Sequence, residues 1–251
     1  MDVPAYLARI AYDGPLSPSA ATLRRLQVAH LVTVPFENLS IHAGEPIVLD
    51  DLALFEKIVL RRRGGFCYEL NGLFSVLLRE LGFDVAMLSA GVARADGGFG
   101  PEFDHMSLLV ELEDRWLADV GFGDSFLEPL LLDERGEQVQ VGRAYRIEPD
   151  GDRLVLLRRE ADSGWVAQYR FSLERHGIAD YAGMCRYHQT SPRSSFTQRR
   201  ICSRATADGR LTLSDMRVIT TRGGERTERM VADDAEYRVL LREHFGIVMP
   251  G

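Results

Sequence analysis

The chain has few of the features that mark secreted or membrane-spanning proteins. Its 251 residues include 3 cysteines, an odd number and widely spaced, so a disulfide framework is not expected and a reducing compartment is favoured. No apolar run approaches the roughly 18 residues needed to cross a bilayer. The first residues, Met1-Asp2-Val3-Pro4-Ala5-Tyr6, contain neither the basic nor the apolar segment of a secretory signal. The sequence therefore predicts a soluble, cytoplasmic protein.

Lysine is almost absent too, because Lys57 is the only one and the remaining positive charge is arginine. The simpler explanation is a GC-rich coding bias, although guanidinium groups also bind phosphate well. The net charge is −7 and the pI is near 5.4, which argues against nucleic acid as the main partner. Hydrophobic content of 45% and charged content of 27% are those of an ordinary globular protein.

The pattern of apolar residues divides the chain into three regions. Residues 1–85 have the pattern of a small helical bundle, with Pro4 and Pro18 near helix starts. Residues 86–200 alternate strands with turns, as in an antiparallel β-barrel or curved sheet. Residues 201–251 combine short strands with a final helix over about 233–245. The fold class is therefore α+β. The strands expected after the bundle are 85–92, 106–112, 115–120, 144–147, 154–158, 166–171, 211–213 and 216–221.

One cysteine, Cys67, stands where a thiol would be reactive. From Leu70 onward, apolar residues recur at the i, i+3, i+4, i+7 spacing of a buried amphipathic helix, and Gly64-Gly65 form a tight turn just before it. The thiol is therefore expected in the first turn of a helix, where unpaired backbone N–H groups and the helix dipole favour an anion. Such a position lowers the pKa of a cysteine and favours the nucleophilic thiolate.

A base and a residue that orients it follow downstream. His105 precedes an apolar run over 106–112 that is typical of a buried strand, and Asp119 closes the next expected strand, 115–120. Glu113-Asp114 between them is typical of a hairpin turn. Antiparallel neighbours joined so closely would hold the imidazole and the carboxylate together. Cys67, His105 and Asp119 are therefore a candidate catalytic triad.

Taken together, these segments resemble the arylamine N-acetyltransferase family. The similarity covers most of residues 1–200 in the same order, and the last fifty residues match only loosely. The resemblance implies an N-terminal helical bundle, a central β-barrel and a small C-terminal α/β lid, with the triad arranged as in cysteine proteases. It rests on Val34-Pro35-Phe36-Glu37-Asn38, Arg62 to Asn71, His105 before its strand, Asp119-Val120-Gly121-Phe122-Gly123 and Thr190 to Thr197.

The same resemblance implies a reaction. An acetyl group would pass from acetyl-CoA, a cosubstrate and not a tightly bound cofactor, to Cys67, and then to an arylamine, arylhydroxylamine or hydrazine with ping-pong kinetics. Gly121, Phe122 and Gly123 would lie near the coenzyme. No metal, nucleic acid or membrane is expected as a partner, and a homo-oligomer is left open. The acceptor pocket would draw on Phe36, Val92, Phe126 and Phe196.

Other functions are compatible with the same residues. An amide synthase that releases a polyketide chain as a macrolactam would keep the triad and use a carrier-bound acyl chain. A cysteine peptidase or transglutaminase-like hydrolase has the same Cys, His, Asp order. A non-catalytic binding protein is disfavoured because the whole triad is present.

Several further residues have less distinctive settings. Arg63 and Glu69 flank the thiol and are expected to form a structural ion pair with each other. Cys185 and Cys202 are expected to be structural, because the Cys-x-x-His spacing of Cys185 and His188 lacks a second ligand pair for zinc. The remaining histidines are expected at surface or capping positions: His30, His42, His176 and His244.

Overall fold

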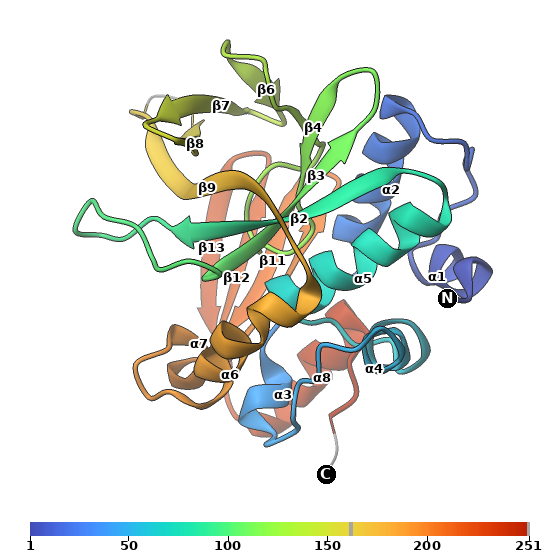
Figure 1. Ribbon diagram of the computed structural model, residues 1–251. Coiled ribbons are helices and arrows are strands. Elements are labelled where there is room, and N and C mark those ends of the chain that lie inside the picture. Colours follow the sequence, from blue (N-terminus) through green and yellow to red (C-terminus); the bar gives the residue numbers. More distant parts are fainter. Residues whose placement is uncertain (161–162, 250–251) are drawn as a thin grey trace.

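Helices from the first part of the chain pack against one side of a barrel-like sheet (Figure 1), in a computed structural model that describes residues 1–160 and 163–249. The strongest sequence pattern is confirmed, because the helix predicted after Gly64-Gly65 is α5 and its apolar face is buried. This helix, α5 (Cys67–Glu80), contacts the barrel strands β2 (Asp84–Val92) and β3 (His105–Glu111). The helical segments are α1 (Val3–Arg9), α2 (Ala20–Thr33), α3 (Leu39–His42), α4 (Asp51–Phe55), the π-helical turn η1 (Glu56–Leu60), α5 (Cys67–Glu80), the 3-10 turn η2 (Ile178–Tyr181), α6 (Ala182–Thr190), α7 (Ser195–Gln198) and α8 (Asp234–Phe245).

The predicted barrel is confirmed as a nearly closed antiparallel sheet of 8 strands, in the order β5-β4-β3-β2-β9-β8-β7-β6. Side chains bridge its two edges: Gln138 exchanges hydrogen bonds of 2.8 and 2.9 Å with the backbone of Leu131, and Gln140 bonds the backbone of residues 127 and 128. The strands are β2 (Asp84–Val92), β3 (His105–Glu111), β4 (Arg115–Ala118), β5 (Leu130–Leu131), β6 (Gln138–Gln140), β7 (Arg143–Asp150), β8 (Arg153–Glu160) and β9 (Val166–His176).

A second antiparallel sheet has 5 strands, in the order β1-β10-β11-β12-β13. The sequence predicts parts of β11 and β12 but not the other three strands. Every residue of β13 is exposed, so its sequence lacks the alternating apolar pattern by which a strand could be predicted. The final helix is confirmed: the side chain of Asp233 caps α8, and Gly246 ends it at a φ of +68°. The strands are β1 (Phe36–Glu37), β10 (Ile201–Thr206), β11 (Gly209–Ser214), β12 (Arg217–Arg222) and β13 (Glu225–Met230).

The helices η2, α6 and α7 connect the two sheets, where the sequence predicts no helix. The start of α6 has no side-chain cap, and few of its residues are buried, so neither of the usual helix signals is present. The proposed division at residues 85 and 200 stays a prediction, and β1 shows that the second sheet also takes residues from the first region.

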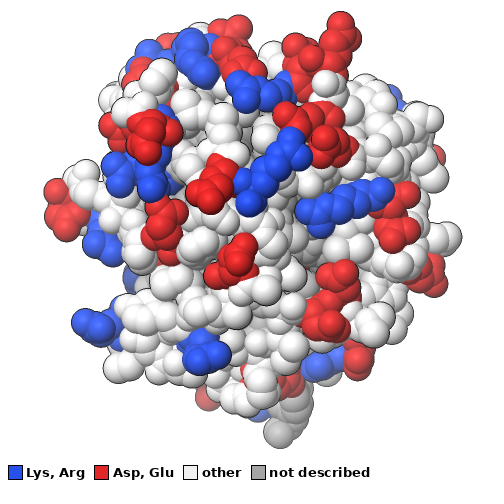
Figure 2. Space-filling view, in the orientation of Figure 1, with Lys and Arg blue, Asp and Glu red and all other residues white. Residues whose placement is uncertain are grey.

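On the face of the molecule in Figure 2, basic and acidic side chains are interspersed, without a broad patch of one sign. Within the described residues, no helix has both the length and the apolar character that crossing a membrane requires.

His30 corrects one prediction, because its side chain is not at the surface. It is 0% exposed, its Nδ1 atom lies 2.8 Å from the hydroxyl of Tyr6, and the ring of Phe74 packs edge-on against it. Burial lowers the pKa of His30 from its ordinary 6.5 to about 3. The histidine is therefore held in its neutral form inside the helical layer.

This burial predicts an acid-sensitive fold. Between about pH 6.5 and pH 3 only the unfolded chain carries the extra proton, so the free energy of unfolding falls with falling pH, by about 1.4 kcal/mol per pH unit. His30→Gln should remove this component. Urea unfolding at pH 7 and pH 5 should show a smaller pH difference for this variant than for wild type. Exposed His244→Gln should keep the wild-type difference, and an unchanged difference in His30→Gln would contradict the prediction.

Candidate functional site

Cys67 lies where the sequence predicts, as the first residue of α5. The turn before it is packed too tightly for side chains. A Cβ atom at Gly64 would lie 2.0 Å from the carbonyl oxygen of Pro35, and one at Gly65 would lie 2.7 Å from the side chain of Glu69. Since even a methyl group would collide there, the paired glycines are required by packing, and they fix the position of the thiol.

Burial raises the pKa of the Cys67 thiol, whereas the sequence predicts a lowered pKa. Cys67 is 3% exposed, and burial raises the pKa of its thiol well above the ordinary value, although a backbone hydrogen bond from Met106 acts the other way. The lowered pKa predicted from the helix N-terminus is therefore not found for the thiol alone. A thiolate at this position needs a positive partner, and His105 directly precedes Met106 on β3.

His105 and Asp119 are in direct contact, as the hairpin pattern predicts. The Nε2 atom of His105 lies 2.7 Å from Oδ2 of Asp119, and both side chains are buried. A carboxylate can only accept, so Nε2 carries the proton and Nδ1 is left as the basic nitrogen. The thiol of Cys67 forms a hydrogen bond with the backbone of Met106, the residue that follows His105. The structure thus brings the three residues together, and their catalytic role stays a prediction.

The carboxylate of Asp119 is held by 4 donors. Oδ2 accepts from His105 and, at 3.2 Å, from the hydroxyl of Tyr169, while Oδ1 accepts from Asn71 Nδ2 at 2.9 Å and from the backbone N–H of Gly121 at 2.8 Å. These four contacts fix the position of the carboxylate. Tyr169 is not predicted from the sequence, because nothing in its strand distinguishes it from the barrel core.

Asn71 joins the nucleophile helix to the strands that carry the base. Its Nδ2 atom also donates to the carbonyl of Met106 at 2.6 Å, and its Oδ1 atom accepts from the N–H of Val120 at 2.9 Å. Gln27 of α2 accepts from the N–H of Asp119 at 3.1 Å. The relative position of Cys67 and Asp119 is therefore set by buried hydrogen bonds between elements that lie far apart in the sequence.

The loop Gly121-Phe122-Gly123 packs directly on the triad. A Cβ atom at Gly121 would lie 2.7 Å from the Cα atom of Cys67, and Gly123 has a φ of +91°. The ring of Phe122 stands edge-on to His105, with ring centroids 5.1 Å apart. Both glycines are therefore required, one for close approach and one for its backbone conformation.

Gly121→Ala should consequently impair the site more than the fold. The added methyl group meets helix backbone that cannot turn aside, so the loop and the thiol must move apart. A displacement of about 1 Å lowers rates by about 10²-fold, and we expect a loss of this order in kcat/KM. Gly183→Ala, where the methyl group meets open space on α6, should keep wild-type activity. Wild-type rates in Gly121→Ala would contradict this reading of the loop.

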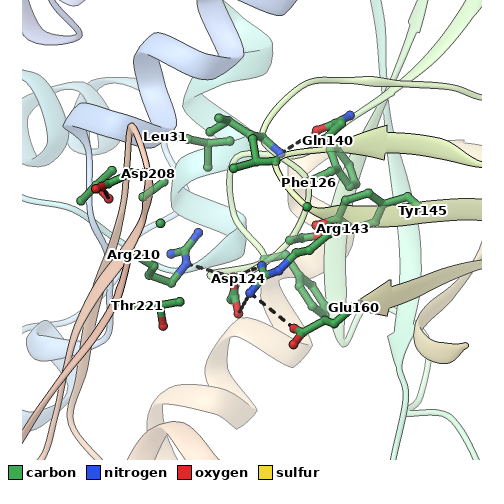
Figure 3. Close-up of a pocket in the computed structure, with 18 of the residues that line it drawn as sticks. Leu31, Asp124, Phe126, Gln140, Arg143, Tyr145, Glu160, Asp208, Arg210 and Thr221 are labelled. Atoms are coloured by element: carbon green, nitrogen blue, oxygen red, sulfur yellow. Dashed lines mark hydrogen bonds and ion pairs between the residues drawn. The ribbon is translucent and has the colours of Figure 1, made fainter. Parts of the chain in front are cut away.

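A cavity of about 630 Å³ opens beside this loop, between the barrel and the second sheet (Figure 3). Asp119, Phe122 and Gly123 line it, together with Leu31 of α2 and segments of both sheets. Of the predicted acceptor residues, Phe126 lines this cavity. Phe36 and Phe196 pack against each other with centroids 6.1 Å apart, Phe36 also lies against Gly123, and Val92 ends β2. These three side chains do not line this cavity, and the role of all four residues in acceptor binding stays a prediction.

Asp124 forms a charged centre in the cavity that the sequence analysis missed. Its carboxylate accepts from Arg143 at 2.6 Å and from Arg210 at 3.0 Å (Figure 3). Arg158 lies 3.6 Å from it. Burial alone would raise the pKa of Asp124, but these arginines outweigh it and hold the pKa below its ordinary value. Because Arg210 belongs to β11 and Arg143 to β7, the ionised carboxylate ties the two sheets together.

The predicted ion pair between Arg63 and Glu69 is wrong. Arg63 instead pairs with Glu37 of β1 at 2.9 Å, and Glu69 pairs with Lys57 at 2.6 Å. Both carboxylates are buried, so each requires its own cation. The pairing depends on how β1 and η1 pack around the turn at Gly64-Gly65, which local spacing does not reveal.

The chain is similar to known proteins over almost its whole length. A family model described as N-acetyltransferase matches residues 19–250. The arylamine N-acetyltransferase of Escherichia coli K12 is 36% identical over 246 residues, which are 96% of this chain and 87% of that protein. The chain belongs to the arylamine N-acetyltransferase family. It is therefore a member of an acyltransferase family, as its sequence motifs predict.

Other members of this family, and a relative with another name, agree over nearly the whole chain. The Salmonella typhimurium arylamine N-acetyltransferase structure superposes with a TM-score of 0.92 at 33% identity, covering 98% of this chain and 90% of that one. The Mycobacterium marinum arylamine N-acetyltransferase in complex with CoA gives 0.91 at 33% identity, covering 98% and 93%. Proansamycin X synthase of Amycolatopsis mediterranei is 33% identical over 96% of this chain and 95% of its own length. The α+β fold predicted from the resemblance is confirmed.

Proposed function

We propose that this enzyme moves an acetyl group from acetyl-CoA to an arylamine, arylhydroxylamine or hydrazine through a thioester on Cys67. The observation that carries the proposal is the buried His105–Asp119 pair at 2.7 Å beside a cysteine at the start of a helix. The solved relative with bound CoA supports a coenzyme thioester as the donor. The glycine loop and the cavity beside it supply a route for that donor to the triad.

In the first half of the reaction, Nδ1 of His105 takes the proton of the Cys67 thiol. Asp119 stabilises the imidazolium, and this adjacent positive charge offsets the burial that otherwise disfavours the thiolate. The thiolate attacks the carbonyl carbon of the acetyl thioester, and the carbon–sulfur bond to coenzyme A breaks. The departing sulfur takes the proton from His105, which leaves an acetylated Cys67.

In the second half, the amine nitrogen of the acceptor attacks the acetylated Cys67. His105 accepts the proton that the nitrogen loses, and the bond to the Cys67 sulfur breaks. His105 then returns the proton to that sulfur, which restores the thiol and the starting state. Backbone N–H groups at the start of α5 are available to stabilise the oxyanion of each tetrahedral intermediate. The order of the steps predicts ping-pong kinetics.

Intact-protein mass after incubation with acetyl-CoA alone tests the proposal. Wild type should gain one acetyl group, Cys67→Ala should gain none, and an aromatic amine or hydrazine should remove it from wild type. Loss of the acetyl group to water at the same rate without amine would instead indicate a hydrolase.

An amide synthase is the second candidate. It is favoured by proansamycin X synthase, of which this chain covers 95%, against 87% of the Escherichia coli enzyme. If Cys67 stays unmodified by acetyl-CoA yet reacts with an alkylating agent, another acyl donor must be used, and this candidate becomes the preferred one.

A further inference from the structure

We propose that Lys57 is a positioning residue for Cys67, whose positive charge acts through the carboxylate of Glu69 on the first turn of α5. The inference rests on the proposed role of Cys67 as the nucleophile. Neither the sequence motifs nor the triad geometry involves this lysine.

The chain of contacts is short and buried. The Nζ atom of Lys57 lies 2.6 Å from Oε1 of Glu69, with 12% and 1% of the two side chains exposed. The other carboxylate oxygen, Oε2, accepts from the backbone N–H of Phe66 at 3.1 Å. Phe66 immediately precedes Cys67, so one ion pair separates the lysine from the backbone that carries the thiol.

The surrounding backbone has little freedom to adjust. The side chain of Glu69 fills the space beside Gly65, where a Cβ atom would lie 2.7 Å from it. On the other side of the turn, Arg9 donates to the carbonyls of Arg62 and Arg63, at 3.3 and 3.2 Å. Glu69 therefore caps the first turn of α5 from within a tightly packed segment.

An unusual backbone conformation places the side chain of Lys57 against Glu69. It lies in the π-helical turn η1, which is closed by a hydrogen bond of 2.8 Å from the N–H of Arg61 to the carbonyl of Glu56. Such turns are rare in proteins, and those that do occur are often found at functional sites. This is also the only lysine among 30 basic residues, so the preference for arginine is broken at this position alone.

The charge of Lys57 is needed because of what surrounds Glu69. Burial, and the nearby carboxylate of Glu37, raise the pKa of Glu69, while Lys57 lowers it; the net direction is upward. Arg63 is occupied by Glu37 at 2.9 Å. Without Lys57 the pKa of Glu69 would rise further, and a protonated carboxyl group would hold the N–H of Phe66 less strongly, because charge-assisted hydrogen bonds are the stronger ones.

The test measures the reactivity of Cys67 with iodoacetamide between pH 6 and pH 9. In Lys57→Met the curve of alkylation rate against pH should shift to higher pH by about one unit. The rate at pH 7 should therefore fall by about tenfold. In the acetylation half-reaction kcat should fall with little change in KM for acetyl-CoA. Lys57→Arg should restore the wild-type profile, since it restores the charge. Arg61→Gln, which removes an exposed charge from the same segment, should match wild type.

A purely structural role would give a different result. Lys57→Met would then lower the melting temperature but keep the wild-type pH profile, and that outcome overturns the proposal. If Lys57→Met does not fold, Glu69→Gln answers the question, because it keeps a side chain that can accept from Phe66 but removes the charge. A wild-type profile in Glu69→Gln would also overturn the proposal. Alkylation requires no acetyl-CoA, so failure of the proposed acetyl transfer would be seen separately.

Discussion

Cys67→Ala should abolish both the acetylation of the protein by acetyl-CoA and the acetylation of any amine. The thiolate is the only group in the proposed mechanism that bonds to the acyl carbon, so no other residue can replace it. Cys67→Ser should lose activity by several orders of magnitude, because a hydroxyl ionises far less readily than a thiol. The side chain that is removed is small, so the free energy of unfolding should change by no more than about 2 kcal/mol. Steady-state rates and intact mass measure the first effect, and urea unfolding the second.

Cys202→Ala is the matched control. Cys202 is also buried, but it lies in β10 within the core under α8, and none of the histidine–aspartate pairs among the described residues lies beside it. It should keep wild-type acetylation. Appreciable turnover by Cys67→Ala, or an acetyl group that stays on the protein in that variant, would exclude the thioester mechanism.

The sequence predicts those parts of the site that are encoded locally. The helix that begins at Cys67 has a strong apolar period and two glycines before it, and both reflect contacts visible in the structure. His105 and Asp119 are found because a short hairpin joins their strands. Each of these features depends on residues in the same helix or in neighbouring strands. Periodicity and turn signals operate over this range of the sequence.

The rest of the site depends on contacts between distant segments. Tyr169 meets Asp119 across 50 residues and Gln27 meets it across 92, and neither has a local signal. Arg63 finds Glu37 rather than Glu69 for the same reason. Similarly, β13 escapes prediction because its pairing with β12 is satisfied by backbone hydrogen bonds while its side chains stay in solvent. Tertiary packing decides these features, and local spacing does not encode them.

Asp119→Asn should reduce kcat/KM by about 10³- to 10⁴-fold, because the amide no longer fixes the tautomer of His105 or stabilises its charged form. It should also destabilise the fold. All 4 groups around the carboxylate are donors in the structure. In one orientation the new NH₂ group faces Nε2 of His105 and the hydroxyl of Tyr169. In the other it faces the N–H of Gly121 and the amide of Asn71.

The second orientation leaves donors pointing at donors, so the first is preferred, and the imidazole must then turn its lone pair toward the amide. Its proton moves to Nδ1, the nitrogen that should receive the proton of Cys67, and this is why the base is lost while the ring stays in place. A buried donor left without its partner lowers stability by about 1–3 kcal/mol. Rates and urea unfolding should therefore both fall, whereas Asp133→Asn, at an exposed pair with Arg115, should change neither. A rate within about fivefold of wild type, a change of only about 1 kcal/mol in the barrier, would show that Asp119 does not act through His105.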